Sequence, residues 1–310
     1  MQDMNFQGVL PILPTPFTAT GNVDESSMRR LIDFELEVGV HGVSILGFMG
    51  ESHKMAESER KLVVRSVVDQ IGGAIPTWVG VRAFGSAGAI EQAREAQELG
   101  ADAVFVAPIG IQNDQALFNH YAAVAESVQM PVIIHDFPES FGTILSAELI
   151  ARMANEIPGV DYIKLEELPV LDKLSKIRAL ANDDFGIFGG LGGEYFLEEL
   201  QRGANGIMTG FAFPEVLVGI YNAYRAGDFK RAAGIFDRYI PLIRYEFQPK
   251  IGLAYRKFVY HHRGVIDTQF IRPPGRLIDA YTERELTTII ERVGLSLSAK
   301  GVQAAEPWNH

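Results

Sequence analysis

Gly159-Val160-Asp161-Tyr162-Ile163-Lys164-Leu165-Glu166 is a short, largely apolar run that ends in a lysine and a carboxylate two residues apart. We interpret the run as a buried strand in which Lys164 is the last inward-facing residue. Residues i and i+2 of a strand point to the same side, so the amine of Lys164 and the carboxylate of Glu166 can face one pocket. Burial disfavours the ammonium form of a lysine, and the neutral amine can attack a ketone to give a Schiff base. An ion pair at a strand end is the alternative interpretation.

Similar apolar runs alternate with amphipathic segments along most of the chain. The strand-like runs cover residues 8–13, 41–46, 76–81, 102–107, 131–134, 160–164, 185–188 and 205–208. The helix-like segments cover residues 24–38, 57–71, 87–99, 114–128, 146–156, 168–180, 194–202 and 214–225. Eight strand–helix units predict a (β/α)8 TIM barrel of the α/β class rather than an open doubly wound sheet. No G-x-G-x-x-G motif follows the first strand and no P-loop motif occurs, which argues against a nucleotide-binding sheet.

The alternation stops after Gly227. We therefore divide the chain into a barrel at residues 1–226, a helical extension of the same domain at 227–298, and a tail at 299–310 that we expect to be frayed. Helical patterns in the extension cover residues 229–245, 250–262 and 283–293. Its many aromatic side chains predict packing on the barrel or a contact between subunits.

Composition narrows the class of protein. The chain has 310 residues, 47% of them hydrophobic, and a formal net charge of -11, which argues against nucleic acid or an anionic membrane as a partner. No cysteine occurs, so disulfides and thiolate chemistry are excluded. The N-terminus lacks the pattern of a signal peptide and no run of eighteen apolar residues occurs, so we expect a cytoplasmic protein.

In a (β/α)8 barrel the reacting groups lie at the C-terminal ends of the strands. Of the nine lysines, Lys164 is the one that ends a predicted strand, and Lys54 in the second loop is its nearest competitor. The other residues at predicted strand ends are Thr15, residues 47–52, Arg82, Ile109-Gly110, His135-Asp136, residues 189–193 and Thr209-Gly210. The glycine-rich run at 189–193 predicts a mobile loop over the pocket.

The order of these motifs resembles the dihydrodipicolinate synthase / N-acetylneuraminate lyase family of Schiff-base-forming barrels, over roughly residues 8–293. The motifs that carry the resemblance are Leu13-Pro14-Thr15-Pro16-Phe17, Gly47-x-x-Gly50-Glu51-Ser52, Gly100-Ala101-Asp102-Ala103, the turn from His135 to Pro138, and Ile163-Lys164. The resemblance implies a homodimer or homotetramer in which Lys164 forms an imine with a small α-keto acid. It implies no metal and no other cofactor.

The chain departs from the synthases and lyases of this family at the proton relay. Phe48 and Met49 replace the two threonines of the glycine turn, and Ile109 and Gly110 replace the paired tyrosines after strand four. His135 replaces the strand-five tyrosine, and Ser140 replaces the arginine that binds the second substrate. Dihydrodipicolinate synthesis itself is therefore not expected.

A Lys-x-Glu arrangement without the strand-five tyrosine is similar to the 2-keto-3-deoxy-pentonate dehydratase branch, of which the L-arabonate enzyme is the best example. The segments Met208-Thr209-Gly210 and Phe213-Pro214 agree with that branch, whereas Gly50-Glu51 does not. In the resulting hypothesis Lys164 condenses with C2 of a 2-keto-3-deoxy sugar acid. Glu166, with a pKa raised by an apolar pocket, removes a C3 proton and assists departure of the C4 hydroxyl. His135 is either a second acid/base or a hydrogen-bonded structural histidine.

Substrate binding is expected from the second strand's turn. Backbone N–H groups of Phe48, Met49 and Gly50 can bind the substrate carboxylate, because such a turn offers unpaired donors to an anion. Met208 and Thr209 complete the predicted substrate-binding residues. Arg82 either binds a distal substrate group or forms a structural ion pair with Glu51 or Asp102.

Three other functions remain compatible with the sequence. A pyruvate aldolase would use the same iminium and cleave the C3–C4 bond. A metal-dependent lyase would place a divalent ion among His135, Asp136, Glu166 and Glu51. A catalytically inert barrel that senses a sugar acid would bind without turnover and tolerate Lys164→Ala.

Overall fold

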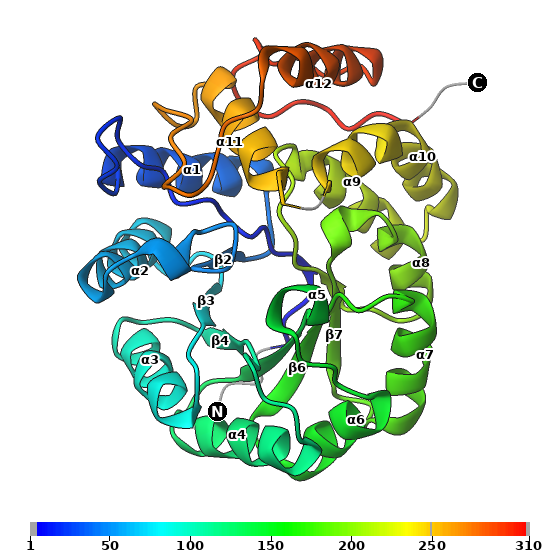
Figure 1. The fold of residues 1–310 in the computed structure, drawn as a ribbon. Coiled ribbons are helices and arrows are strands. Elements are labelled where there is room, and N and C mark those ends of the chain that lie inside the picture. The colour runs from blue at the N-terminus through cyan, green and yellow to red at the C-terminus, as the bar shows by residue number, and fades with distance from the viewer. Residues whose placement is uncertain (1–4, 249, 308–310) are drawn as a thin grey trace.

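The computed structural model describes residues 5–248 and 250–307, and in these residues eight parallel strands are surrounded by helices (Figure 1). The hydrogen-bonded order is β1-β8-β7-β6-β5-β4-β3-β2. The strands are β1 (Gly8–Val9), β2 (Val43–Ile45), β3 (Thr77–Val81), β4 (Ala103–Val106), β5 (Val132–Asp136), β6 (Val160–Leu165), β7 (Gly186–Gly189) and β8 (Gly206–Ile207). Bonds of 2.8 Å from Leu13 N to Ser44 O and from Ser44 N to Pro11 O join the segment after β1 to β2, at the other end of this order. The predicted (β/α)8 barrel is confirmed.

Helices follow the strands as the alternating pattern predicts. They are α1 (Glu25–Val38), α2 (Glu57–Ile71), α3 (Ser86–Glu98), α4 (Asp114–Glu126), α5 (Pro138–Phe141), α6 (Ala147–Glu156), α7 (Val170–Leu180), α8 (Phe196–Gln201) and α9 (Pro214–Arg225). The one-turn helix α5 was not predicted, because four residues are too short for a helical period. Helix α7 begins at Val170, later than expected, since the residue before Pro169 avoids the helical conformation.

Strand β6 follows the alternation that places the lysine. Tyr162 belongs to the apolar cluster inside the barrel, whereas Ile163 and Leu165 belong to the larger cluster between strands and helices. Lys164 therefore points inward, above Tyr162, and is only 3% exposed. The inward orientation expected from the sequence is confirmed.

The barrel interior below Lys164 is filled with apolar side chains. They are Phe6, Leu10, Ile12, Trp78, Ala103, Phe105, Ile133, Tyr162, Phe188 and Met208. The rings of Phe6 and Trp78 lie 5.2 Å apart, and those of Trp78 and Phe188 lie 5.0 Å apart. Because these rings fill the interior of the barrel, the site has to lie above them, at the C-terminal ends of the strands.

The C-terminal extension forms helices α10 (Phe229–Glu246), α11 (Gly252–His262) and α12 (Ala280–Arg292), which lie beside α1 and α9 at the top of Figure 1. Tyr239, Tyr255, Phe258 and Tyr260 are all buried in the main core cluster. These aromatic side chains therefore pack within the chain, which is one of the two roles expected from the sequence.

The tail is held in place rather than frayed. Arg263 donates to Gly301 O at 2.8 Å, Gln303 N donates to Glu215 Oε1 at 3.2 Å, and Glu306 N donates to the hydroxyl of Tyr239 at 3.3 Å. The expectation of fraying is wrong for residues 299–307, because these backbone groups find partners on the extension and α9. Residues 308–310 lie outside the described residues.

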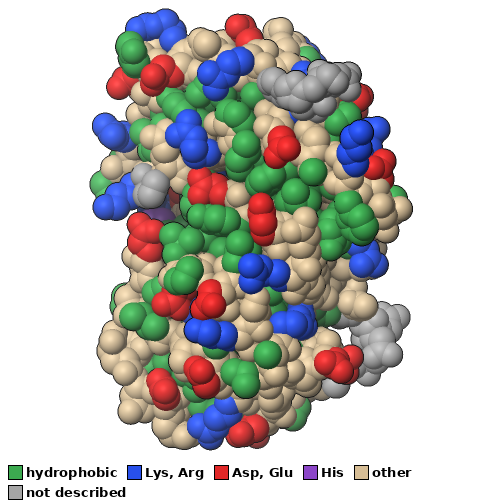
Figure 2. Space-filling model, turned by 90° about the vertical axis from the view of Figure 1, so that its right-hand side faces the viewer, with side chains coloured by type: hydrophobic (Ala, Val, Ile, Leu, Met, Phe, Trp, Pro, Cys, Tyr) green, Lys and Arg blue, Asp and Glu red, His purple; other side chains and the backbone are tan. Residues whose placement is uncertain are grey.

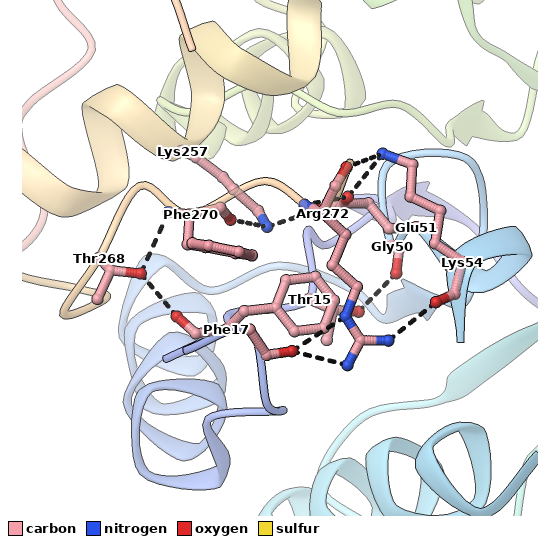
Figure 3. Close-up of polar contacts among 10 residues, drawn as sticks. Thr15, Phe17, Gly50, Glu51, Lys54, Lys257, Thr268, Phe270 and Arg272 are labelled. Atoms are coloured by element: carbon pink, nitrogen blue, oxygen red, sulfur yellow. Dashed lines mark hydrogen bonds and ion pairs between the residues drawn. The ribbon is translucent and has the colours of Figure 1, made fainter. Parts of the chain in front are cut away.

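A cluster of charges joins the extension to the turn after β2 (Figure 3). The carboxylate of Glu51 is buried and accepts from Lys257 Nζ at 2.7 Å, from Lys54 Nζ at 2.9 Å and from Arg272 N at 3.1 Å. Lys257 comes from α11 and also donates to Phe270 O at 2.8 Å. We call Glu51, Lys54, Lys257 and Arg272 the turn clamp. It fixes the conformation of the turn that carries Phe48 and Met49.

The outer surface carries mixed charges. Figure 2 shows the side of the molecule at the right of Figure 1, where acidic and basic side chains lie interspersed among apolar ones. The negative net charge is thus distributed on this face rather than gathered in one patch. In the part of the chain that the structure describes, no helix has the length and apolar character needed to cross a bilayer.

Glu35 on α1 makes the stability of the fold depend on pH. One carboxylate oxygen accepts from the hydroxyl of Tyr260 at 3.0 Å, the other has no partner among the described residues, and Glu215 and Arg263 are the charged groups that act on it. Burial raises the pKa of Glu35 from 4.5 to about 8. Because the folded state holds this proton more tightly, its contribution to stability is present below pH 4.5 and is lost as pH rises through about 8.

We predict that Glu35→Gln flattens the decline of the melting temperature between these pH values. Calorimetry of both proteins across that range tests this. Glu37→Gln, at an exposed position of the same helix, should leave the slope unchanged. Equal slopes for the Glu35→Gln variant and the parent would show that Glu35 does not titrate in this way.

We predict that Lys257→Met lowers the free energy of unfolding by about 3 to 5 kcal/mol, because it leaves the buried Glu51 charge short of a partner. Urea denaturation measures the loss. The control Lys61→Met breaks partly exposed ion pairs with Glu57 and Glu95 and should cost less than about 1 kcal/mol. Similar losses in both variants would contradict the importance assigned to the turn clamp.

Candidate active site

A cavity of about 380 Å³ opens at the C-terminal ends of the strands. Residues from the barrel and from the extension line it together. They are Ile12, Gly47, Phe48, Met49, His135, Phe137, Glu139, Ser140, Lys164, Glu166, Thr209, Gly210, Phe247, Gln248, Lys250, Gly252, Leu253 and Arg256. The volume suits a small organic acid, and most of the lining is apolar.

Lys164, Glu166 and His135 form a triangle in this cavity. Lys164 Nζ lies in direct hydrogen-bonding contact with Glu166 Oε2 and 3.1 Å from His135 Nε2. His135 Nε2 is also 3.1 Å from Glu166 Oε2. All three side chains are buried, so an amine, a carboxylate and an imidazole meet away from bulk water.

Burial sets the protonation of this triangle. It lowers the pKa of Lys164, although the Glu166 carboxylate opposes that shift, and the positive charges of Arg82 and Arg256 lower it further. Burial lowers the pKa of His135 to about 3, helped by Lys164, so the imidazole is neutral. For Glu166, burial alone raises the pKa, but the Lys164 charge and the His135 hydrogen bond outweigh it and lower the pKa to about 2. The raised pKa expected for Glu166 is therefore wrong.

Alternation along β5 separates His135 from Asp136. His135 faces the barrel mouth, whereas Asp136 points to the helix layer and binds Lys173 Nζ of α7 at 2.6 Å. Lys173 also pairs with Glu167. Of the two polar residues expected at the end of strand five, only His135 thus lines the cavity.

Glu166 lies just beyond β6 and is oriented by the glycine-rich run after β7. Its Oε1 accepts from Leu191 N at 3.2 Å. A Cβ atom on Gly190 would lie only 2.4 Å from Glu166 Cγ, so this position has no room for a side chain. The run from 189 to 193 is buried and supports Glu166, rather than forming the loop over the pocket that was expected.

The turn after β2 carries backbone N–H groups that have no partner in the described part of the chain. Among residues 5–248 and 250–307, the N–H groups of Phe48 and Met49 donate to no other protein group. Their side chains line the cavity. Gly50 lies behind them, with its carbonyl accepting from Thr15 Oγ1 at 2.7 Å, and does not line the cavity.

Arg82 is placed differently from both expectations. Its guanidinium stacks over the Phe48 ring at 3.5 Å and lies 5.2 Å from the centre of the Phe141 ring. The structural ion pair expected with Glu51 or Asp102 is wrong, since Glu51 belongs to the turn clamp and Asp102 accepts from Thr77 N at 2.7 Å. Arg82 does not line the cavity and acts on Lys164 through its charge.

The two residues predicted at the end of strand eight have different positions. Thr209 lines the cavity, and its Oγ1 accepts from Gly192 N at 3.0 Å. Met208 is fully buried in the interior cluster below the cavity and does not line it. Both residues follow β8, which ends at Ile207, and the chain passes from the interior cluster at Met208 to the cavity at Thr209.

Arg256 was missed by sequence reasoning. It comes from α11, is 4% exposed, and reaches the cavity beside Met49, with Nη1 2.6 Å from Met49 Sδ. No motif marks it, because 207 residues separate the two partners and the extension was expected to pack on the barrel or to form a subunit contact. Phe247 likewise enters the cavity from beyond the barrel.

The alternative metal site is not assembled. Glu51 and Asp136 are bound by lysines, away from the His135–Glu166 contact. In the described part of the chain, no group of three or more His, Asp or Glu side chains is arranged to hold a metal ion. The geometry favours amine chemistry at Lys164.

Comparison with known proteins agrees with this arrangement. A model described as the dihydrodipicolinate synthetase family matches residues 5–293. The L-2-keto-3-deoxyarabonate dehydratase of Azospirillum brasilense is 31% identical over 294 residues, which cover 93% of this chain and 94% of that enzyme. The 4-hydroxy-tetrahydrodipicolinate synthase of Methanopyrus kandleri is 34% identical over 248 residues, covering 78% and 82%.

Among solved structures, the dihydrodipicolinate synthase of Rhodopseudomonas palustris superposes with a TM-score of 0.88 at 30% identity. The match covers 93% of this chain and 98% of that one. Both the sequence match and the barrel thus extend from near the N-terminus into the extension. The chain belongs to the dihydrodipicolinate synthetase family.

Proposed function

We propose that this protein is a class I, Schiff-base-forming lyase that dehydrates a 2-keto-3-deoxy sugar acid. The observation that carries the proposal is the contact of the buried Lys164 amine with Glu166 and His135 in one cavity. A lysine with a lowered pKa beside a carboxylate is suited to imine formation followed by proton transfer. Similarity to an L-2-keto-3-deoxyarabonate dehydratase over 93% of the chain supports the choice of substrate class.

The reaction begins when the neutral amine of Lys164 adds to the C2 carbonyl. Loss of water with uptake of one proton from solvent gives an iminium, and the same proton is released when the iminium is hydrolysed. The iminium withdraws electrons and acidifies C3. Glu166, ionised because its pKa is about 2, takes the C3 proton and delivers it to the departing C4 hydroxyl, so that one water leaves. A second water then hydrolyses the imine and restores the amine. His135 orients Glu166 or relays a proton.

A pyruvate-forming aldolase is the second candidate. It uses the same iminium, but the base removes the proton of the C4 hydroxyl and the C3–C4 bond breaks. Several relatives are named 4-hydroxy-tetrahydrodipicolinate synthases, which supports this candidate at the level of the family. Phe48 and Met49 in place of the two threonines, and His135 in place of the tyrosine, argue against the synthase reaction itself.

We propose a small α-keto acid as ligand, bound by the free N–H groups of Phe48 and Met49, with Thr209 beside it. We further propose a homo-oligomer, either a dimer or a tetramer, in the cytoplasm, and a reaction that needs no cofactor.

The proposed imine predicts that borohydride reduction in the presence of pyruvate leaves a stable adduct on Lys164. The buried amine is the nucleophile, so peptide mass spectrometry should find the modification at this residue. Lys164→Ala should abolish both adduct and turnover, whereas Lys54→Ala should keep the adduct. Turnover by Lys164→Ala, or an adduct on another lysine, would contradict the proposal, and binding of a sugar acid without turnover would favour a sensor.

A further prediction separates dehydration from cleavage. Glu166→Gln should lower dehydration on the order of 100- to 10,000-fold, because the proton acceptor is lost, while the pyruvate adduct still forms. Chromatography of products from 2-keto-3-deoxy acids measures the dehydrated acid and pyruvate separately. Glu167→Gln is the matched control, since that carboxylate pairs with Lys173 outside the triangle. Pyruvate as the main product of the parent enzyme would establish the aldolase.

A further inference from the structure

Arg256 is a buried cation whose donors are not used up by the protein. Its side chain is enclosed, yet its Nε has no hydrogen-bond partner among the described residues. The nearest carboxylate, Glu246 Oε2, lies 3.8 Å from Nε and already accepts from Ala212 N at 3.1 Å. A buried guanidinium with spare donors is costly unless another group satisfies it.

The charge of Arg256 is only partly neutralised. Burial raises the pKa of Glu246 to about 7, so near neutral pH this carboxyl is protonated in a large share of molecules. A guanidinium stays charged at that pH. Arg256, which lines the cavity, therefore keeps positive charge that can attract an anion.

The surrounding backbone is shaped to admit the guanidinium. A Cβ atom on Gly210 would lie 3.1 Å from Arg256 Cζ, and one on Gly252 would lie 3.2 Å from Nη1. Gly210 lies in the segment that follows β8, and Gly252 begins α11. Their missing side chains leave the space through which Arg256 reaches the cavity.

Arg256 also lies at the turn whose N–H groups are free. Nη1 contacts Met49 Sδ, and the N–H groups of Phe48 and Met49 donate to no protein group in residues 5–248 and 250–307. Arg256 is near enough to Lys164 to lower the pKa of that amine through its charge. Two free amides and one guanidinium thus lie on one side of the cavity, within electrostatic reach of the nucleophile.

From this arrangement we infer that Arg256 binds the carboxylate of the α-keto acid and is a specificity-determining residue of the site. The inference rests on the proposed imine chemistry at Lys164. Phe48 and Met49 provide no side-chain hydroxyl for an anion, and the guanidinium supplies charge-assisted donors in their place. The extension then contributes directly to substrate recognition.

The test compares pyruvate with methyl pyruvate, which keeps the ketone but has no negative charge. Borohydride trapping at Lys164 is titrated with each ketone in the parent, in Arg256→Met and in Arg256→Lys. For Arg256→Met, the half-saturating concentration of pyruvate should rise on the order of 10- to 100-fold, since a hydrogen-bonded charge is lost. That of methyl pyruvate should rise much less, through the change at the Lys164 amine alone. Arg256→Lys should lie between the two for pyruvate.

The control is Arg292→Met, which removes an exposed arginine of α12 and should change neither value. If Arg256→Met weakens both ketones equally, or neither, Arg256 does not read the carboxylate. If Arg256→Met does not fold, the pyruvate-selective weakening in Arg256→Lys decides. If the proposed imine chemistry is wrong, the parent protein forms no adduct with either ketone. That outcome differs from every outcome in which only the role of Arg256 is wrong.

Discussion

Lys164 and Glu166 are buried next to each other at the mouth of the barrel, and the site is organised around that pair. Removing a charge from water is unfavourable unless a partner and further hydrogen bonds compensate for it. Lys164 has Glu166 and His135, while Glu166 also has the Leu191 amide. The same enclosure lowers the pKa of the amine, so the burial that is unfavourable for stability also favours the neutral form of Lys164.

The extension is part of the site and not only a cover. Through Lys257 and Arg272 it holds Glu51, and through Glu51 it fixes the turn that presents two unpaired amides. Through Arg256 it places a cation in the cavity itself. A single helix, α11, therefore carries two neighbouring basic residues with separate tasks, one directed to the protein's own carboxylate and the other toward the cavity.

The sequence was sufficient for the barrel and for its central lysine because both follow from local periodicity. The inward position of Lys164 depends only on the alternation within β6. The sequence could not place Arg82 or Arg256, since their surroundings come from segments far apart in the chain. The pKa of Glu166 was predicted in the wrong direction. Burial alone raises it, but the nearby Lys164 charge and the His135 hydrogen bond lower it by more. The position of the tail could not be predicted either, because it is held by partners such as Glu215 that no local sequence pattern reveals.

The turn clamp has a consequence for how the protein is made. The turn after β2 is synthesised early, but Lys257 and Arg272 are translated more than 200 residues after Glu51. Until they arrive, a nascent chain with all eight strands complete has only Lys54 of the turn clamp to pair with Glu51. We expect such a chain to be inactive as an enzyme. Activity would then be gained in one late step, when about the last sixth of the polypeptide packs against the barrel.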